Sequence, residues 1–158
     1  MEDALSSKLI PTFKNGVNDM KRNKVIVVGC GRLGANIATK LSEMGEDVHI
    51  LDMNEDAFRK LRETFSGFEM VGDATDLSVL ESAQIKLAKS VVVTTNNDNT
   101  NIFIAHVAYY IYNVPRIVVR LSDTDKGELL DGTRITAIYP FILSLNQYLG
   151  INGGGEDK

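Results

Sequence analysis

Short β-branched runs alternate with longer stretches of helical periodicity through most of this chain. The run at 25–28 is entirely valine and isoleucine, and the run at 90–94 is nearly uninterrupted valine. Such continuous apolar runs are typical of parallel strands that are buried on both faces. Between the runs, apolar positions recur every three or four residues, as on the buried face of a helix. The predicted strands are 25–28, 48–51, 68–71, 90–94, 116–120 and 136–138, and the predicted helices are 32–44, 55–65, 77–83, 100–113, 124–130 and 140–149.

Six strands alternating with helices predict an α/β fold with a Rossmann-like, doubly wound parallel sheet of order 3-2-1-4-5-6. We expect residues 24–150 to form this single domain. Residues 1–23 are polar and aperiodic, so we interpret them as an N-terminal extension, and we expect 151–158 to be a flexible tail. In such a sheet the ligand crevice lies at the carboxyl ends of strands one and four.

The same periodicity predicts which helical side chains face the core and which face solvent. In the second predicted helix, Lys60 falls on the solvent side, opposite a stripe of four apolar residues. In the third predicted helix, Leu77 and Leu80 are expected to face inward. We expect Gly150 to stop the last helix, because glycine is common at that position.

The turn between the first strand and the first helix reads Gly29-Cys30-Gly31-Arg32-Leu33-Gly34. A Gly-x-Gly-x-x-Gly motif alone is weak evidence, but this one follows a strand, opens a helix and precedes a strand-end carboxylate by about 20 residues. The first glycine permits a tight turn, the second lets the backbone approach a pyrophosphate, and the third lets the helix pack on the strand. The helix N-terminus offers its free N–H groups to phosphates. The motif in this context predicts an adenine-nucleotide site.

The strand-end carboxylate is Asp52. In this position a carboxylate accepts hydrogen bonds from an unmodified ribose and disfavours a 2′-phosphate, so NADP is not the expected ligand. NAD(H), ATP, ADP and AMP share the adenosine half and stay open as alternatives. The structural alternative is that Asp52 only caps the following helix.

Composition narrows the class of protein. At 158 residues and 44% hydrophobic content, the chain has enough apolar material for one domain with a substantial core. A formal charge of −4 argues against nucleic acid as a partner. A single cysteine excludes an intramolecular disulfide and fits a reducing compartment. With no signal-peptide pattern and no apolar stretch long enough to span a bilayer, we expect a cytoplasmic protein.

Neither the cysteine nor the histidines suggest chemistry strongly. Cys30 lies at a helix N-terminus, where a thiol pKa can fall, but a small side chain between two glycines is explained by space alone. His49 and His106 have no Cys or His partner at ligand spacing, so we assign no metal site. We assign no catalytic residue.

The helix predicted over 100–113 has almost no polar face. A helix that is apolar all round is buried on both sides. One side is expected to pack on the sheet and the other to meet another subunit, so we predict a homodimer or a higher homo-oligomer.

Four segments together resemble one family, the RCK or KTN domain of Trk/Ktr-type potassium-uptake regulators, with its TrkA-N-like nucleotide-binding fold. The resemblance covers about residues 24–143, and the Gly-Asp-Ala-Thr element is more specific than the glycine motif. The segments are Val-Val-Gly-Cys-Gly-Arg-Leu-Gly at 27–34, Leu-Asp at 51–52, Val-Gly-Asp-Ala-Thr at 71–75 and Thr-Asn-Ile at 100–102.

The resemblance implies a role for each candidate residue. The glycine turn with Arg32 and Leu33 would contact the diphosphate, Asp73 and Ala74 would border the adenine, and Thr94, Thr95 and Asn96 would form the far wall. Arg32 and Arg120 would reach a terminal phosphate, the former across a subunit boundary. The full set of predicted nucleotide-binding residues is Gly29, Cys30, Gly31, Arg32, Leu33, Gly34, Asp52, Met53, Asp73, Ala74, Thr75, Thr94, Thr95, Asn96 and Arg120.

Several of these positions have a structural alternative. Asp73 would then only cap the helix near Leu77, and Arg32 and Arg120 would be solvated cations. The family often has acids where this chain has Asn97 and Asn99. These two residues and Asp98 fit helix caps and ligand contacts equally well.

The resemblance implies a non-catalytic sensor: a cytoplasmic subunit, peripheral on the inner face of the cell membrane, that docks on a potassium transporter and changes its gating when a nucleotide binds. The alternative is a minimal NAD-dependent oxidoreductase. Against it, no tyrosine is followed four residues later by lysine, and residues 24–149 leave no room for a substrate domain.

Overall fold

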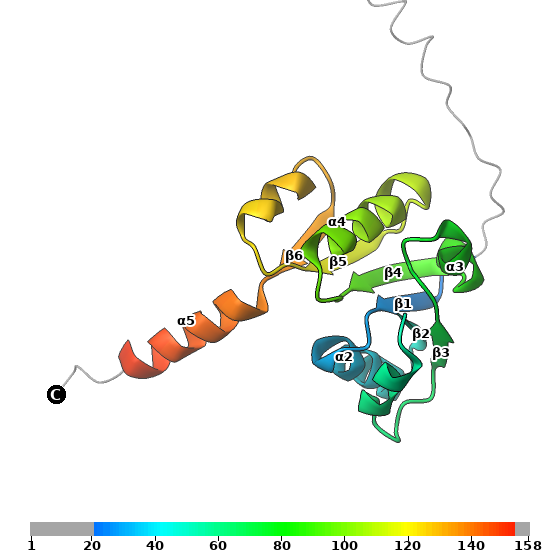
Figure 1. The fold of residues 1–158 in the computed structure, drawn as a ribbon, viewed down its shortest axis with the longest axis horizontal. Coiled ribbons are helices and arrows are strands. Elements are labelled where there is room, and N and C mark those ends of the chain that lie inside the picture. The colour runs from blue at the N-terminus through cyan, green and yellow to red at the C-terminus, as the bar shows by residue number, and fades with distance from the viewer. Residues whose placement is uncertain (1–20, 154–158) are drawn as a thin grey trace, which may run out of the picture.

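The computed structural model describes residues 21–153 and contains one six-stranded sheet in the order β3-β2-β1-β4-β5-β6 (Figure 1). Every neighbouring pair of strands is parallel, as predicted. The strands are β1 (Lys24–Val28), β2 (Asp47–Asp52), β3 (Phe68–Val71), β4 (Ala88–Val93), β5 (Arg116–Arg120) and β6 (Ile135–Ile138). The helices are α2 (Arg32–Glu43), α3 (Leu77–Ser82), α4 (Asp98–His106) and α5 (Pro140–Gly153), with 3-10 turns η1 (Glu55–Lys60), η2 (Ile85–Leu87) and η4 (Asp125–Leu130) and a π-helical turn η3 (Val107–Ile111).

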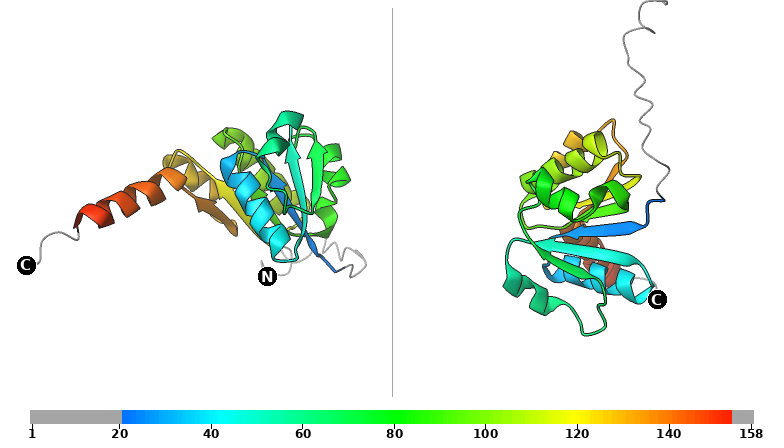
Figure 2. Two further views of the ribbon diagram at one scale, coloured as in Figure 1. Left: turned by 90° about the horizontal axis from the view of Figure 1, so that it is seen from below. Right: turned by 90° about the vertical axis from the view of Figure 1, so that its right-hand side faces the viewer.

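Helices cover both faces of the sheet, with α2 on one side and α4 on the other (Figure 2). The central strand β1 contributes to both cores, because its side chains alternate between the faces. Val25 and Val27 pack on the α2 side, and Ile26 and Val28 pack on the α4 side. This double burial explains why the strand is a continuous apolar run.

The helix predicted over 55–65 is wrong in extent. Only the 3-10 turn η1 forms, and Leu61 already has an extended backbone with φ −67° and ψ 142°. Leu61 and Phe65 still pack against the α2-side core, from a turn instead of a helix. The apolar spacing therefore predicts which side chains pack against the core, two of them buried and two partly buried, but it does not require helical backbone between them.

Three other helices also differ from the prediction, in burial or in a boundary. Leu77 was expected to face inward but is 39% exposed at the start of α3, whereas Leu80 is fully buried as expected. The helix expected over 100–113 begins at Asp98, after Asn97 as N-cap, and continues beyond α4 as the wider turn η3. The last helix does not stop at Gly150 but runs to Gly153. Residues 1–20 and 154–158, which hold most of the predicted extension and tail, lie outside the described residues.

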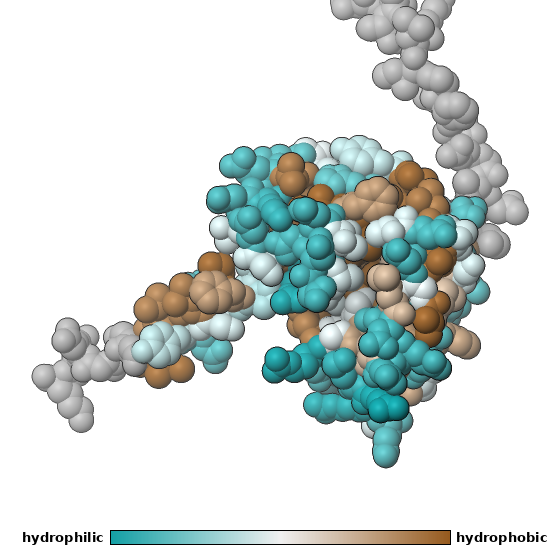
Figure 3. Space-filling view, viewed as in Figure 1, coloured by the Kyte–Doolittle hydropathy of each residue, from teal (hydrophilic) through white to brown (hydrophobic). Residues whose placement is uncertain are grey.

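Helix α5 extends away from the sheet into solvent (Figure 1). Its fourteen residues include no charged side chain, and the helix is brown over much of its surface in the hydropathy view (Figure 3). Six of its large apolar residues are 41% to 72% exposed: Phe141, Leu143, Leu145, Tyr148, Leu149 and Ile151. Within residues 21–153, none of the helices combines the length and apolarity needed to cross a membrane.

Candidate functional site

The glycine motif forms the turn that joins β1 to α2. Gly29 has φ +95°, a conformation that favours glycine, and its N–H donates to the carbonyl oxygen of Leu51 at 2.8 Å. A Cβ atom added at Gly34 would lie 1.9 Å from the carbonyl oxygen of Gly29. A Cβ at Gly31 would have no described atom within 4 Å. The first and third glycines therefore permit the fold, while the second leaves its backbone open to a ligand.

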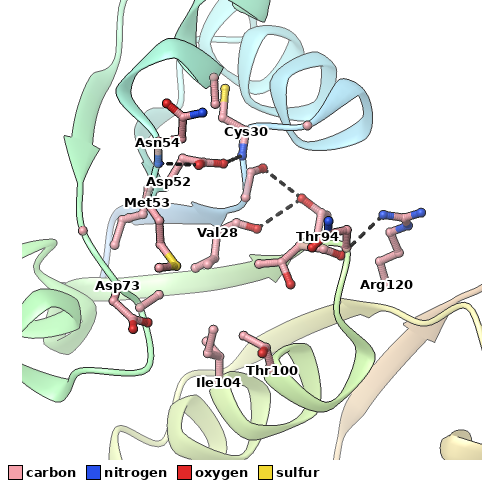
Figure 4. A pocket seen from close by; sticks show the side chains of 18 of the residues that line it. Val28, Cys30, Asp52, Met53, Asn54, Asp73, Thr94, Thr100, Ile104 and Arg120 are labelled. Carbon is pink, nitrogen blue, oxygen red and sulfur yellow. Dashed lines mark hydrogen bonds between the residues drawn. The ribbon is translucent and has the colours of Figure 1, made fainter.

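An open cleft lies above this turn, at the carboxyl ends of β1, β2, β4 and β5 (Figure 4). Asp52 and Asp73 lie on one side of it, and Arg120 lies on the opposite side. The structure brings eleven of the fifteen candidate residues together in its lining, namely Gly29, Cys30, Gly31, Asp52, Met53, Asp73, Ala74, Thr94, Thr95, Asn96 and Arg120.

Four candidates are not part of the lining. Arg32 is exposed and Leu33 half-buried in the first turn of α2, while Gly34 is buried against the turn itself. Thr75 instead completes a turn, because its N–H and its hydroxyl both donate to Asp73 Oδ1, at 2.9 and 2.7 Å. These residues were predicted to bind the nucleotide because they belong to the sequence motifs. They do not line the cleft, because the helix or turn that carries each residue sets its direction.

Asp52 joins the end of β2 to the glycine turn. Its Oδ2 accepts a hydrogen bond from the Cys30 N–H at 2.7 Å, and its Oδ1 accepts one from the Asn54 N–H at 2.9 Å. The N-cap of η1 is Asn54, whose side chain accepts from the Asp56 N–H, so Asp52 is not the cap of that helix. Each carboxylate oxygen keeps a second lone pair for a ribose hydroxyl.

Cys30 is fully buried beneath the turn. Burial, reinforced by the negative charge of Asp52, raises the pKa of the thiol from 9.0 to about 11. The fall in pKa that a helix N-terminus can cause is therefore outweighed here. A thiol that stays protonated and enclosed lacks the properties of a redox sensor.

The loop after β3 is organised by Asp73 and Asp76. The hydrogen bonds from the Thr75 side chain and backbone hold the pKa of Asp73 below its usual value. The N-cap of α3 is Asp76, whose carboxylate accepts from the Ser78 N–H at 2.8 Å. The alternative that Asp73 caps this helix is wrong, and Asp73 faces the cleft as an ionised carboxylate.

The far wall of the cleft follows β4. The Thr94 hydroxyl is within hydrogen-bond distance of the carbonyl oxygens of Val28 and Gly29, at 3.2 and 3.1 Å, so it ties the wall to the glycine turn. The buried side chain of Asn101 holds Thr95. Beside them, at the end of the neighbouring strand β5, Arg120 Nη1 donates to the Thr95 carbonyl oxygen at 3.4 Å.

The polar run after this wall has structural roles. Asn97 caps α4 by accepting from the Thr100 N–H at 2.9 Å. Asp98 is buried and accepts from the main-chain N–H groups of Ser122 and Asp123. Asn99 accepts from Lys126 Nζ at 3.0 Å. None of the three asparagine and aspartate side chains from 97 to 99 lines the described cleft, so the cap interpretation is favoured.

Eight lining residues are absent from the predicted set of nucleotide-binding residues, although two of them, Gly72 and Thr100, lie in loops expected at the crevice. Thr100 and Ile104 are one turn apart on α4, so a search for positions four apart on the helix after β4 would have found them. Lys60 was assigned to solvent and is indeed exposed, but the 3-10 winding of η1 also places it at the rim of the cleft. The missed residues are Val28, Leu51, Asn54, Ala57, Lys60, Gly72, Thr100 and Ile104.

The sequence matches a known family over most of its length. Residues 25–140 match the TrkA-N domain. The chain is 35% identical over 133 residues to the Trk system potassium uptake protein TrkA homolog of Pyrococcus abyssi (strain GE5 / Orsay), covering 84% of this chain and 55% of that protein. The chain spans about half the length of the curated relatives it matches.

Solved structures share the fold. The TrkA-N domain of inner membrane protein ybaL from Escherichia coli has a TM-score of 0.72 at 19% identity, over 82% of this chain and 96% of that chain. The crystal structure of GsuK bound to ADP has a TM-score of 0.67 at 25% identity, over 84% of this chain and 34% of that chain. Family match, strand order and glycine turn agree, and the chain belongs to the TrkA-N family of RCK-type nucleotide-binding domains.

Proposed function

We propose that this chain is a non-catalytic regulatory domain of a potassium-uptake system, which responds to an adenine nucleotide held in the cleft. The observation that carries the proposal is the open backbone at Gly31 beside the strand-end carboxylate of Asp52. The N-terminus of α2 and the Asp52 carboxylate are adjacent, so a single nucleotide could place its phosphates at the first and its ribose at the second. The relationship to TrkA proteins supports the potassium-uptake part.

The ligand is an adenine nucleotide without a 2′-phosphate. The glycine turn would receive the diphosphate, Asp52 the ribose hydroxyls, and the side chains of Met53 and Ala74 the adenine face. A 2′-phosphate would meet the Asp52 carboxylate, which disfavours NADP. The related GsuK structure contains ADP, which supports this class of ligand. ATP, ADP, AMP and NAD(H) all satisfy these contacts.

The lining of the cleft favours a sensor over an oxidoreductase. Among the described lining residues there is no histidine or tyrosine to act as general acid or base. The cysteine there is Cys30, whose raised pKa keeps it protonated. The cationic groups at the rim, Lys60 and Arg120, are suited to binding phosphate and not to hydride transfer.

A second copy of the chain would cover the exposed apolar surfaces. Phe103, Tyr110 and Ile111 are 48% to 69% exposed on the outer side of α4 and η3, the face that was predicted to meet another subunit. Helix α5 offers a larger uncharged surface. A stable dimer that covers such surfaces is the usual outcome for soluble proteins.

A groove on the α2 side of the sheet is the complementary surface for α5. Its lining includes five apolar residues, Val25, Ile37, Leu41, Val92 and Val118, together with Ser90 and the charged residues Glu46, Lys89 and Arg116. Every copy carries both the groove and the helix, so an exchange about a two-fold axis would cover both at once. Because α5 follows β6, ligand-dependent movement in the sheet would change the arrangement of the two copies, which is the change a potassium transporter on the membrane would detect.

A thermal-shift titration tests nucleotide binding directly. The purified protein is titrated with ATP, ADP, AMP, NAD⁺, NADH and NADP⁺. A ligand at 100 times its dissociation constant is expected to stabilise the fold by about 2.7 kcal/mol. Asp52→Asn should abolish the shift, and the matched control Asp56→Asn, at an exposed residue outside the cleft, should retain it. If none of the first five ligands raises the melting temperature, the proposal fails, and a shift with NADP⁺ alone contradicts the assigned role of Asp52.

A further inference from the structure

The buried amide of Asn101 connects the two strand ends that form the far side of the cleft. Asn101 is completely buried on α4. Its Oδ1 accepts from the N–H of Thr95 at 3.1 Å and from the Thr95 hydroxyl. Its Nδ2 donates to the carbonyl oxygens of Thr95 at 3.0 Å and Arg120 at 2.9 Å. The side-chain amide thus uses both donors and both acceptor positions.

The guanidinium of Arg120 is held much more weakly than its main chain. The contact of Nη1 with the Thr95 carbonyl oxygen is 3.4 Å, longer than an ordinary N–H···O hydrogen bond. A guanidinium has five N–H donors in a planar fork, and Arg120 is half-buried at the lining of the cleft. Its main-chain carbonyl, in contrast, is fixed by Asn101.

The Thr95 carbonyl oxygen therefore has two donors, one strong and one replaceable. If the Arg120 guanidinium turns toward a phosphate, the carbonyl keeps the 3.0 Å hydrogen bond from Asn101. Without Asn101, the same movement would leave a partly buried acceptor unsatisfied, which is costly. The amide of Asn101 lowers the free-energy cost of releasing Arg120.

We infer that Asn101 is a positioning residue for phosphate recognition: it fixes the Thr95 wall and the Arg120 main chain so that the guanidinium can exchange the Thr95 carbonyl for a phosphate beyond the α-phosphate of the nucleotide. The inference rests on the proposed function and deepens it. It assigns the preference among adenine nucleotides to the Asn101–Thr95–Arg120 contacts, on the side of the cleft opposite Asp52.

The test compares the affinities of the 158-residue chain for AMP, ADP and ATP by isothermal titration calorimetry. Wild type is expected to bind ATP or ADP more tightly than AMP. Arg120→Gln should reduce that preference by about tenfold, the effect of losing a charge-assisted hydrogen bond. Asn101→Asp should reduce the preference equally, because a carboxylate has no N–H to donate. The Thr95 carbonyl oxygen would then depend on the Arg120 guanidinium, which would stay in place. The double variant should show no further loss, since both changes disable one contact.

The matched control is Asn99→Asp, which makes the same substitution two residues away on α4, at a side chain that contacts Lys126 outside the cleft. Its ATP-over-AMP preference should equal that of wild type. If Asn101→Asp does not fold, Thr95→Val removes the hydroxyl from the same contact and should lower the preference to an intermediate value.

Each remaining outcome counts against the inference. An unchanged ATP-over-AMP ratio in a folded Asn101 variant contradicts it, as does an equal fall in the Asn99 control. A wild-type protein that binds AMP as tightly as ATP also contradicts it, while leaving nucleotide binding itself established. Failure of wild type to bind any of the three overturns the proposed function as well.

Discussion

The carboxylate of Asp52 and the main-chain N–H of Cys30 are 2.7 Å apart, so the end of β2 is hydrogen-bonded to the turn that follows β1. The residue proposed to bind ribose thereby also holds in place the backbone proposed to bind phosphate. Substitution of Asp52 is therefore expected to weaken the contacts with both parts of the nucleotide. Variants of the glycine turn itself separate an effect on folding from an effect on nucleotide binding.

Gly34→Ala is expected to unfold the domain, whereas Gly31→Ala should be tolerated. A Cβ at Gly34 would overlap the Gly29 carbonyl oxygen, and overpacking against rigid backbone should cost more than about 3 kcal/mol of unfolding free energy. Gly31 has φ −77° and open space around its Cβ position, so alanine should keep the fold while weakening nucleotide binding by about tenfold. Urea denaturation and calorimetric titration measure the two quantities. Equal stabilities of the two variants would contradict this account.

Asp98→Asn should reduce the dependence of stability on acid pH. Burial alone would raise the pKa of Asp98, but hydrogen bonds from the N–H groups of Asp123 and Ser122 lower it below the usual value. A folded-state pKa below the unfolded value of about 3.9 means that the stabilisation is present above that pH and is lost as pH falls through the folded-state value.

Urea denaturation between pH 7 and pH 3 tests the role of Asp98. The asparagine variant should lose about 1–3 kcal/mol at pH 7 and show a flatter decline below pH 4. Asp125→Asn, at an exposed carboxylate on η4, serves as the control and should follow the wild-type curve. A variant of Asp98 with the full wild-type acid dependence would refute the assignment.

Cys30 should be unreactive in the folded protein. At a pKa of about 11, about one thiol in a thousand is ionised at pH 8, and the side chain is fully buried. Labelling with a disulfide reagent should therefore proceed only after denaturation. Rapid labelling of the native protein at pH 8 would show that the turn opens or that the thiolate is stabilised.

A charge on one side of α5 should dissociate the proposed dimer. Positions two apart on a helix are 200° apart, so Leu145 and Gln147 lie on opposite sides, and Leu145 shares its side with Phe141 and Leu149. Leu145→Glu should shift the protein toward monomer in light scattering, while Gln147→Glu should leave the mass unchanged. A wild-type monomer at micromolar concentration would exclude the dimer.

The strand order and most of the cleft were predictable because they depend on local patterns. A β-branched strand, a glycine turn and an acid at the end of the next strand identify Gly29, Gly31 and Asp52, whose positions follow from topology. Parallel strands align their carboxyl ends, so the loops after β1, β2 and β4 had to meet.

The remaining features depend on contacts that are distant in sequence. Asn101 belongs to the Thr-Asn-Ile segment that carries the resemblance, but the sequence assigns it no contact, and its hydrogen bonds to the ends of β4 and β5 appear only in the folded chain. The winding of η1 cannot be read from apolar spacing, since the partly buried Leu61 and Phe65 pack against the core without helical backbone between them. The extension of α5 past Gly150 is also unexplained by propensity, because glycine costs a helix about 1 kcal/mol.

The Thr94 hydroxyl lies within hydrogen-bond distance of the carbonyl oxygens of Val28, at the end of β1, and Gly29, and 2.6 Å from where a Cβ of Gly34 would be. The part of the cleft where we propose that the phosphates bind is therefore closely packed without a ligand, so little conformational entropy would remain to be lost there on binding. We expect any adjustment to different ligands to involve side chains farther from this turn, namely the exposed Met53 and the weakly held guanidinium of Arg120. One part of the cleft is therefore fixed by its packing, while the side chains at its edges can change conformation.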